Sequence, residues 1–191
     1  MSAITTRKMT VAEYVEWGER PENADLRTEL VDGEVVEVSS PGEIHGFVCY
    51  MVALAFGGYF QRHGPGYALM NDTGWVVSPD TVRGPDVSVF VGPARGKLSR
   101  GHFTRTPTVC VEVVSPSNRP SEIKARVAQY LDAGVILVWV IYPDTQVVVV
   151  HRPKAVAEIF EPESDITAEP ELPGFTCSVA YLFTVPGLTG E

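Results

Sequence analysis

Apolar residues recur at helical spacing in two long segments of the chain. The first covers residues 43–63 and is followed by Gly64, which predicts a long core helix ending at that glycine. The second covers residues 120–132, where Pro120 suits the first turn and Gly134 suits the position just after the last turn. The apolar stripe of this second helix is formed by Ile123, Val127, Tyr130 and Leu131.

The N-terminal part of the chain carries two local signals. Thr10 and Glu13 form a capping-box pattern, which predicts the start of a short helix. Further on, Asp32-Gly33 separates residues 27–31 from residues 34–38, and this dipeptide between two strand-like runs is the strongest short signal of a hairpin. An N-terminal helix and a β-hairpin are therefore expected before the long core helix.

Three later segments predict the strands of a larger sheet. Residues 75–91, 108–114 and 136–150 contain almost continuous β-branched runs, which are typical of strands covered on both faces. The two long helices are available to cover them. We therefore expect an α/β (α+β) fold with a mixed sheet flanked by helices, in a single domain that occupies residues 1–191 and has its core at about 10–183.

Charge limits the classes of function. The chain has 191 residues and a net charge of −9, which disfavours indiscriminate binding to nucleic acid. The charge is uneven, because no acidic residue lies between Asp86 and Glu112. Basic residues occupy that interval and the segment after it: Arg95, Lys97, Arg100, Arg105, Arg119, Lys124 and Arg126. A basic surface beside two isolated carboxylates is compatible with an acidic protein.

Cysteine usage and hydropathy bear on the compartment. The three cysteines are far apart and form no CxxC pair, so a reducing compartment is the simplest interpretation. The N-terminus lacks the apolar core of a signal peptide, and the longest uninterrupted apolar run, near residues 133–142, is too short to span a bilayer. We expect a cytoplasmic protein with no membrane partner.

Asp86 and Glu112 are the main candidates for chemistry. Asp86 stands at the start of a predicted strand, and Glu112 lies inside another, pointing to the face opposite Val111 and Val113. Two carboxylates from neighbouring strands can chelate a hard divalent cation, which can activate a water and neutralise charge on a phosphate. The residues alone leave a simpler alternative open, in which Asp86 caps a turn and Glu112 forms a buried salt bridge.

Five segments together resemble the Uma2 (Uma-two) family of restriction-endonuclease-like proteins, within the PD-(D/E)xK nuclease superfamily. They are ELVDGEVVEVSSPGEIHG, GPDVSVF, VEVVSPSN, QYLDAGVILVWVIYP and LPGFTCSVAYLF. The resemblance runs from about Thr10 to Phe183 and depends on the order and spacing of the segments. A second Pro-Asp pair, Pro79-Asp80, lies in a predicted turn and is not part of it. The resemblance implies a restriction-endonuclease-like core and a Mg²⁺-dependent (or Mn²⁺-dependent) endonuclease that acts on DNA as a homodimer.

The resemblance also implies roles for acidic residues. Asp86 and Glu112 match the two metal-binding acids. Glu29 matches a further acidic position that could bind a second metal or orient a water, although a solvent-facing hairpin residue is an equal alternative. The superfamily lysine should stand two residues after Glu112, but Val114 occupies that position.

The resemblance implies that a lysine from the following helix, at 120–132, takes the place of that lysine. When the chain is aligned on YLDAGV, the family's lysine corresponds to Arg126, and Lys124 lies on the opposite flank of the apolar stripe. Lys124 could polarise a water or bind phosphate as a point charge. Arg126 could bind phosphate bidentately but is a poor proton carrier, because its guanidinium stays protonated. A solvated helix face is the alternative for either residue.

Contacts with nucleic acid are expected from the basic loop and from the start of the long helix. The candidates are His45, Arg95, Lys97, Arg100, Arg105 and Arg119. The arginines and the lysine could hold a phosphate backbone, and His45 could bind phosphate or carry a proton. The alternatives are a solvated loop and, for His45, a structural hydrogen bond at the start of the helix. His45 and Cys49 share one helical face, but no second ligand pair is visible in the sequence, so a zinc site is not expected.

Three functions remain open. The resemblance favours a Mg²⁺-dependent endonuclease that hydrolyses phosphodiester bonds in DNA. The missing lysine and the negative net charge suit a nuclease-fold module that binds nucleic acid or protein without cutting it. A structural oligomer that does not bind nucleic acid is the third.

Overall fold

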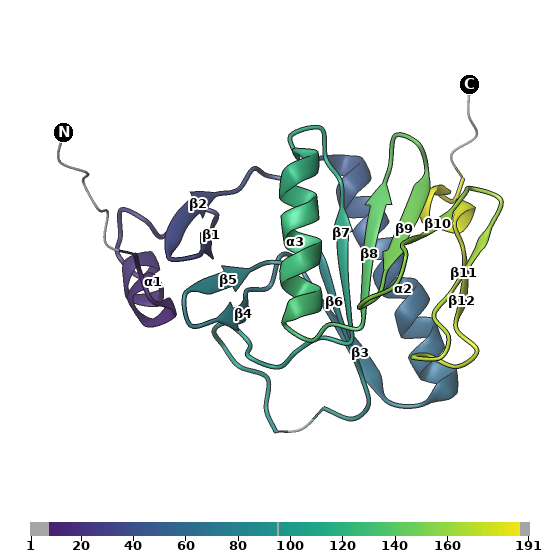
Figure 1. Ribbon diagram of the computed structural model, residues 1–191, viewed down its shortest axis with the longest axis horizontal. Coiled ribbons are helices and arrows are strands. Elements are labelled where there is room, and N and C mark those ends of the chain that lie inside the picture. Colours follow the sequence, from purple (N-terminus) through teal and green to yellow (C-terminus); the bar gives the residue numbers. More distant parts are fainter. Residues whose placement is uncertain (1–7, 95, 188–191) are drawn as a thin grey trace.

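The larger of two main sheets forms the centre of the molecule. A computed structural model describes residues 8–94 and 96–187, and its six-stranded sheet has the order β10-β9-β8-β7-β6-β3 (Figure 1). The strands are β3 (Gly66–Met70), β6 (Val87–Val91), β7 (Val109–Val113), β8 (Leu137–Tyr142), β9 (Val147–His151) and β10 (Glu158–Phe160). Neighbours are antiparallel except β7 and β8, which are parallel and are joined by α3 (Pro120–Asp132). The prediction of a mixed sheet is confirmed.

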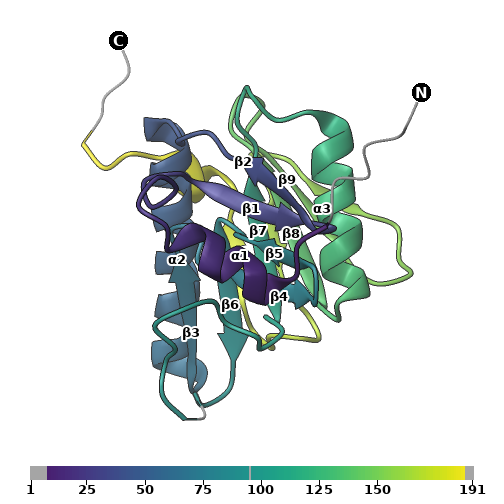
Figure 2. The same ribbon diagram turned by 90° about the vertical axis from the view of Figure 1, so that its left-hand side faces the viewer.

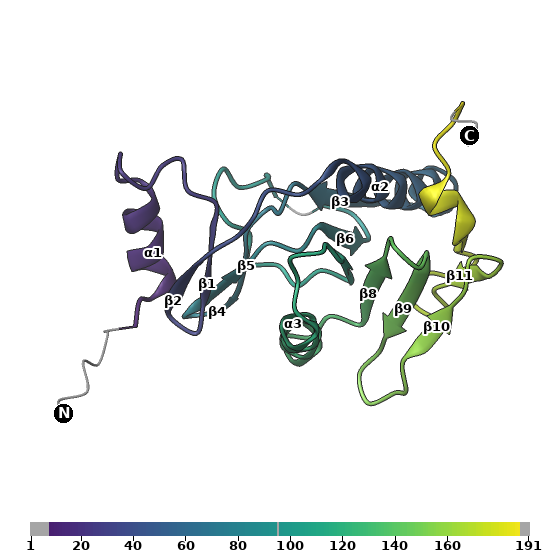
Figure 3. The same ribbon diagram turned by 90° about the horizontal axis from the view of Figure 1, so that it is seen from above.

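Helices cover the two faces of this sheet. α2 (Glu43–His63) lies on one face and α3 on the other, as the view from above shows (Figure 3). Along β7, Val109, Val111 and Val113 belong to the core on the α2 side, while Cys110 belongs to the core on the α3 side. This alternation is the period of two expected of a strand, and it directs Glu112 towards α3.

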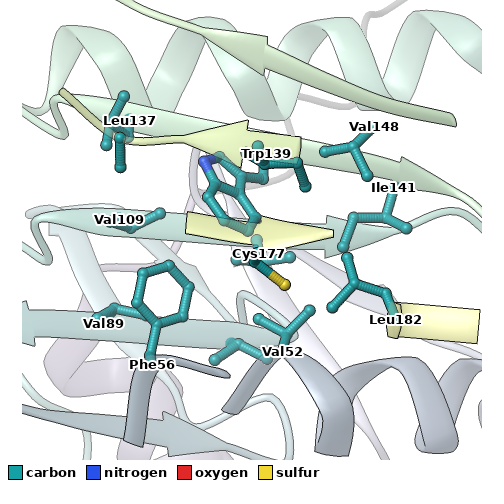
Figure 4. Close-up of a cluster of buried hydrophobic side chains, with 14 of the residues drawn as sticks. Val52, Phe56, Val89, Val109, Leu137, Trp139, Ile141, Val148, Cys177 and Leu182 are labelled. Carbon is teal, nitrogen blue, oxygen red and sulfur yellow. The ribbon is translucent and has the colours of Figure 1, made fainter. Parts of the chain in front are cut away.

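The α2 side contains the larger core. Val52 and Phe56 of α2 meet strand residues such as Trp139, and the C-terminal segment covers the remainder (Figure 4). That segment comprises the hairpin of β11 (Asp165–Thr167) with β12 (Thr176–Ser178) and the 3₁₀ helix η1 (Ala180–Phe183). The sequence analysis did not predict the β11–β12 hairpin, because strands of three residues are too short to show a period.

α2 exposes the apolar residues Ile44, Tyr50 and Leu54 in addition to the apolar face that it buries. It is long and apolar enough to cross a membrane by length and composition. Its buried residues include Val48, Val52 and Phe56, which pack on the sheet. A core helix that packs in this way can have the same length and apolar composition as a membrane-spanning helix.

A second, four-stranded sheet carries the N-terminal helix. Its order is β2-β1-β5-β4, with β1 (Thr28–Val31), β2 (Glu34–Glu37), β4 (Trp75–Ser78) and β5 (Thr81–Arg83). The predicted hairpin is confirmed, since Asp32 and Gly33 form its turn with φ of 49° and 82°. The predicted capping box at the start of α1 (Val11–Gly18) is confirmed as well.

One expectation about the sheets is wrong. Residues 75–91 do not all join the large sheet, because β4 and β5 pair with each other and β5 pairs with β1 of the hairpin. The turn at Pro79-Asp80 folds β5 back on β4, and Gly84 then separates β5 from β6. A Cβ atom at Gly84 would lie 2.7 Å from the carbonyl oxygen of Asp72, so the chain can pass there only without a side chain. The two sheets therefore meet just before Asp86.

Candidate active site

A cleft of about 1110 Å³ lies where the two sheets meet. The small sheet and α1 stand at one end of the large sheet (Figures 1 and 2). Side chains from α1, β1 and β5 line the cleft together with the start of β6, the end of β7 and one side of α3. Among the residues predicted from the sequence, it is lined by Glu29, His45, Asp86, Glu112, Arg119 and Arg126.

Asp86 and Glu112 reach this cleft from neighbouring antiparallel strands. Val87 pairs with Val111, so Asp86 and Glu112 face each other one position further along. Oδ2 of Asp86 accepts a 2.6 Å hydrogen bond from the backbone N–H of Val113, which fixes the aspartate against β7. Both carboxylates therefore line one cleft, Asp86 beside His45 of α2 and Glu112 beside Tyr130 of α3.

Glu112 is buried, with only 6% of its surface exposed. The hydroxyl of Tyr130 donates a 2.6 Å hydrogen bond to its Oε1, and Nη1 of Arg126 lies 3.6 Å from the same oxygen. Burial nevertheless raises the pKa of Glu112 to about 8, with a further contribution from the charge of Asp86, and the two partners on α3 offset only part of this. The buried salt bridge considered from the sequence is thus present but does not fully compensate the acid.

Asp72 is a third acid in the cleft that the sequence analysis missed. It lies in the turn between β3 and β4 with φ of 51°, and it forms an ion pair with Arg27. Burial and the nearby carboxyl group of Asp86 raise its pKa to about 6 despite that pair. Its segment, Asn71 to Gly74, looks like an ordinary turn, so no local signal could have identified it.

His45 and Cys49 extend the site on the α2 side. Nε2 of His45 lies 3.1 Å from Oδ1 of Asp86, and Sγ of Cys49 lies 3.6 Å from Nδ1 of His45. Burial lowers the pKa of His45, but the hydrogen bond to Asp86 and its charge outweigh that effect, so the pKa is raised overall. Burial, with Asp86, also raises the pKa of the Cys49 thiol far above its usual range. One ligand atom from each of these three residues lies within 4.8 Å of the other two.

Glu29 is fully engaged by partners within the chain. Its Oε2 pairs with Arg83 at 2.9 Å and with Arg126 at 2.8 Å. Its Oε1 accepts hydrogen bonds from Gly84 N–H at 2.8 Å and from Arg126 at 2.9 Å. Glu29 is therefore neither solvent-facing nor free to bind a metal in this arrangement, and it holds Arg126 in place.

The two candidate cations of α3 lie in different environments. Arg126 is mostly buried and faces Glu29 and Glu112. Burial lowers its pKa, but Glu112, Tyr130 and Glu29 outweigh that effect, so the pKa is raised overall. Lys124 is exposed and does not line the cleft. Helical spacing predicted that the two would lie on opposite flanks, and the cleft is on the Arg126 flank.

The basic loop contributes little to the cleft. Arg95 lies outside the described residues, and Lys97 and Arg100 are exposed without lining the cleft. Arg105 packs over the rings of Tyr67 and Phe90, with its guanidinium carbon 5.3 and 5.0 Å from the ring centres. Arg119 does line the cleft, and so does Arg27, which the sequence analysis did not select.

The donor set of the cleft suits a hard cation. Asp72, Asp86 and Glu112 present carboxylate oxygens, which Mg²⁺ and Mn²⁺ prefer. Among the hydrogen bonds of the described residues, the one that reaches the carboxylate of Glu112 is donated by Tyr130 to Oε1. Burial first, and then the charge of Asp86, raises the pKa values of Asp72 and Glu112, and a bound divalent cation would favour their ionised forms.

Known proteins provide two further observations. A family model described as "Putative restriction endonuclease", named Uma2, matches residues 11–180. The fold is similar to the crystal structure of a "putative nuclease belonging to DUF820" from Anabaena variabilis, with a TM-score of 0.76, 20% sequence identity, and coverage of 92% of this chain and 97% of that one. No protein of curated function is significantly similar in sequence.

Proposed function

The chain belongs to the Uma2 family of restriction-endonuclease-like proteins, and from that premise we propose that it is a divalent-metal-dependent endonuclease that hydrolyses phosphodiester bonds in DNA. The observation that carries the proposal is the shared cleft of Asp86 and Glu112, in which burial and the charge of Asp86 disfavour the ionised form of Glu112 and a cation would favour it. The nuclease-like core is consistent with it.

In the proposed site, Asp86 and Glu112 hold Mg²⁺ or Mn²⁺, and Asp72 is close enough to Asp86 to assist. A bound Mg²⁺ supplies charge neutralisation at the phosphate and a more acidic water. Val113 N–H orients Asp86, and Tyr130 orients Glu112 by occupying Oε1 and leaving Oε2 for the cation.

Arg126 takes the place of the family's lysine in this proposal. It lies 3.6 Å from Glu112 and is held by both oxygens of Glu29. From there its guanidinium can stabilise charge on a phosphate, but it cannot act as a base, since it remains protonated. Glu29 acts through Arg126 as a positioning residue. Arg27 and Arg119 also line the cleft and are available to bind the DNA backbone.

We also propose that the chain works as a homodimer. One site cuts one strand, so cutting both strands of a duplex in one encounter takes two copies. Sedimentation velocity would reveal a dimer, and supercoiled plasmid would be converted directly to linear DNA. A monomer that only nicks would contradict this part.

The test of the activity is cleavage of supercoiled plasmid with Mg²⁺ or Mn²⁺ and with EDTA. Glu112→Gln and Asp86→Asn should each reduce the rate by about 10³-fold, since each removes a charged ligand from the cation. Asp80→Asn is the matched control, because Asp80 also follows a proline but lies in the β4–β5 turn. Cleavage that survives the substitution at Glu112 would remove the proposal.

A binding module without cleavage is the second candidate. It is favoured by the engagement of Arg126 with two acids and by the fact that none of the described residues lining the cleft is a lysine. It predicts salt-sensitive DNA binding that persists in EDTA together with no nicking under either metal.

A further inference from the structure

The group of His45, Cys49 and Asp86 has the composition of a different metal site from the one formed by acids alone. We propose that these three residues bind a thiophilic divalent cation such as Zn²⁺, through the sulfur of Cys49, one ring nitrogen of His45 and one oxygen of Asp86. Three atoms within 4.8 Å of one another can all lie roughly 2.8 Å or less from a common point. Zinc–ligand bonds are about 2.0–2.3 Å, so side-chain shifts of roughly half an ångström complete the site.

The site is assembled from two elements. His45 and Cys49 are four residues apart on α2, which brings both to the same side of the helix. Asp86 comes from the start of β6, so no spacing in the sequence indicates the third ligand. This is why the sequence analysis, which found only half of a zinc site, did not expect one.

A cation can reach the group through a second cavity. His45, Cys49 and Asp86 all line a cavity of about 390 Å³ that is also bordered by Asp72. Zinc commonly takes three protein ligands and leaves its fourth position to a water, and this cavity provides room for that water. Asp72 borders the same cavity and can accept a hydrogen bond from that water.

The donor atoms select the class of ion. Mg²⁺ prefers oxygen ligands in octahedral geometry and has little affinity for sulfur. Zn²⁺ and Co²⁺ bind thiolate, imidazole and carboxylate together, and a thiophilic ion displaces the thiol proton when it binds. The other two cysteines, Cys110 and Cys177, belong to no such group within the described residues.

Asp86 would be a ligand in both metal sites, and the competition for it that follows rests on the proposed nuclease function. A thiophilic ion bound to His45 and Cys49 would hold an oxygen of Asp86 that the hard cation also uses. Zn²⁺ is therefore expected to inhibit Mg²⁺-dependent cleavage, with Cys49 determining that sensitivity.

Titration of the full chain with Co²⁺ tests the site without reference to activity. Binding should produce the near-ultraviolet charge-transfer absorption of a thiolate–Co²⁺ bond, saturating at one ion per chain and disappearing when Zn²⁺ is added. Cys49→Ser should abolish the band. Cys177→Ser should keep it, and this control is matched because both cysteine residues are 6% exposed. The absence of the band in the unaltered protein would overturn the proposal, and this outcome does not depend on the folding of any variant. A band that survives Cys49→Ser would overturn it as well.

A second measurement separates this proposal from the nuclease. In plasmid cleavage with Mg²⁺, the Zn²⁺ concentration that halves the rate should rise at least about tenfold in Cys49→Ser relative to Cys177→Ser. Equal inhibition of the two variants would contradict the shared use of Asp86. A protein that shows the Cys49-dependent band but never cuts DNA would support the thiophilic site and refute the nuclease.

Discussion

Two groups of buried acidic residues in the same cleft differ in how far the chain itself compensates their charge. Glu29 forms an arginine-bound cluster, in which Arg83, Arg126 and the N–H of Gly84 occupy both of its oxygens. Asp72, Asp86 and Glu112 form a carboxylate cluster, in which the pKa values of Asp72 and Glu112 are raised to about 6 and about 8. The first group is compensated by the chain itself and reinforces the fold, whereas Arg27 and Arg126 compensate the second only in part, which suits it to a cation.

Arg126 joins the two clusters. It donates to both oxygens of Glu29 at 2.8 and 2.9 Å but lies 3.6 Å from Glu112. Its stronger attachment is therefore to the compensated cluster. At this longer distance Arg126 compensates the charge of Glu112 only in part, which is consistent with the raised pKa of the glutamate.

The largest effect is expected from pH in the absence of metal. The pKa of Glu112 is about 8 in the folded protein and 4.5 ordinarily, so the unfolded chain releases this proton first. Stability from this group is complete below about pH 4.5 and is lost as pH rises through about 8. Asp72 acts in the same direction between 3.8 and about 6. The free energy of unfolding should fall by several kcal/mol over this range, since one pKa unit corresponds to about 1.4 kcal/mol.

Urea unfolding in EDTA at a series of pH values measures this fall. Glu112→Gln should remove most of the slope, because glutamine does not titrate. A variant with a slope as steep as that of the unaltered protein would show that the carboxylate cluster is compensated after all, and the contrast between the clusters would be lost.

The next effect concerns the arginine-bound cluster. Glu29→Gln should lower the free energy of unfolding by about 3 kcal/mol, because it leaves the buried charges of Arg83 and Arg126 without their main partner. Glu37→Gln, on the exposed side of the same hairpin, should change it by less than about 0.5 kcal/mol. If Glu29→Gln costs less than about 1 kcal/mol, Glu29 is not the structural anchor described above.

The smallest effect is stabilisation by metal. Mg²⁺ at ten times its dissociation constant should raise the free energy of unfolding by about 1.4 kcal/mol, since it binds only the folded site. Thermal unfolding at pH 8 with and without Mg²⁺ measures the gain, and Asp86→Asn should remove it. An equal gain in that variant would place the binding elsewhere.

Local features of the fold could be predicted from the sequence, and long-range ones could not. The helix at 43–63, the hairpin at Asp32-Gly33 and the capping box at Thr10 depend on neighbours a few residues away, and they appear as predicted. The pairing of β5 with β1 depends on segments about 50 residues apart. No periodicity carries such information.

The same limit applies to the site. Asp86 and Glu112 could be selected because an acid next to or within an apolar strand is unusual. Glu29 was weighed as a ligand or a solvent-facing residue, but its partner Arg126 lies 97 residues away, so its structural role was not visible. Asp72, in an ordinary turn, gave no signal.

The most direct test of the central claim is a crystal structure of the protein soaked with Mn²⁺, examined for anomalous density. We predict a peak within bonding distance of Asp86 and of Oε2 of Glu112, with Tyr130 still donating to Oε1. Density that is absent from the cleft, with Glu112 held by Tyr130 and Arg126 alone, would contradict the claim that this buried acid is kept for a cation.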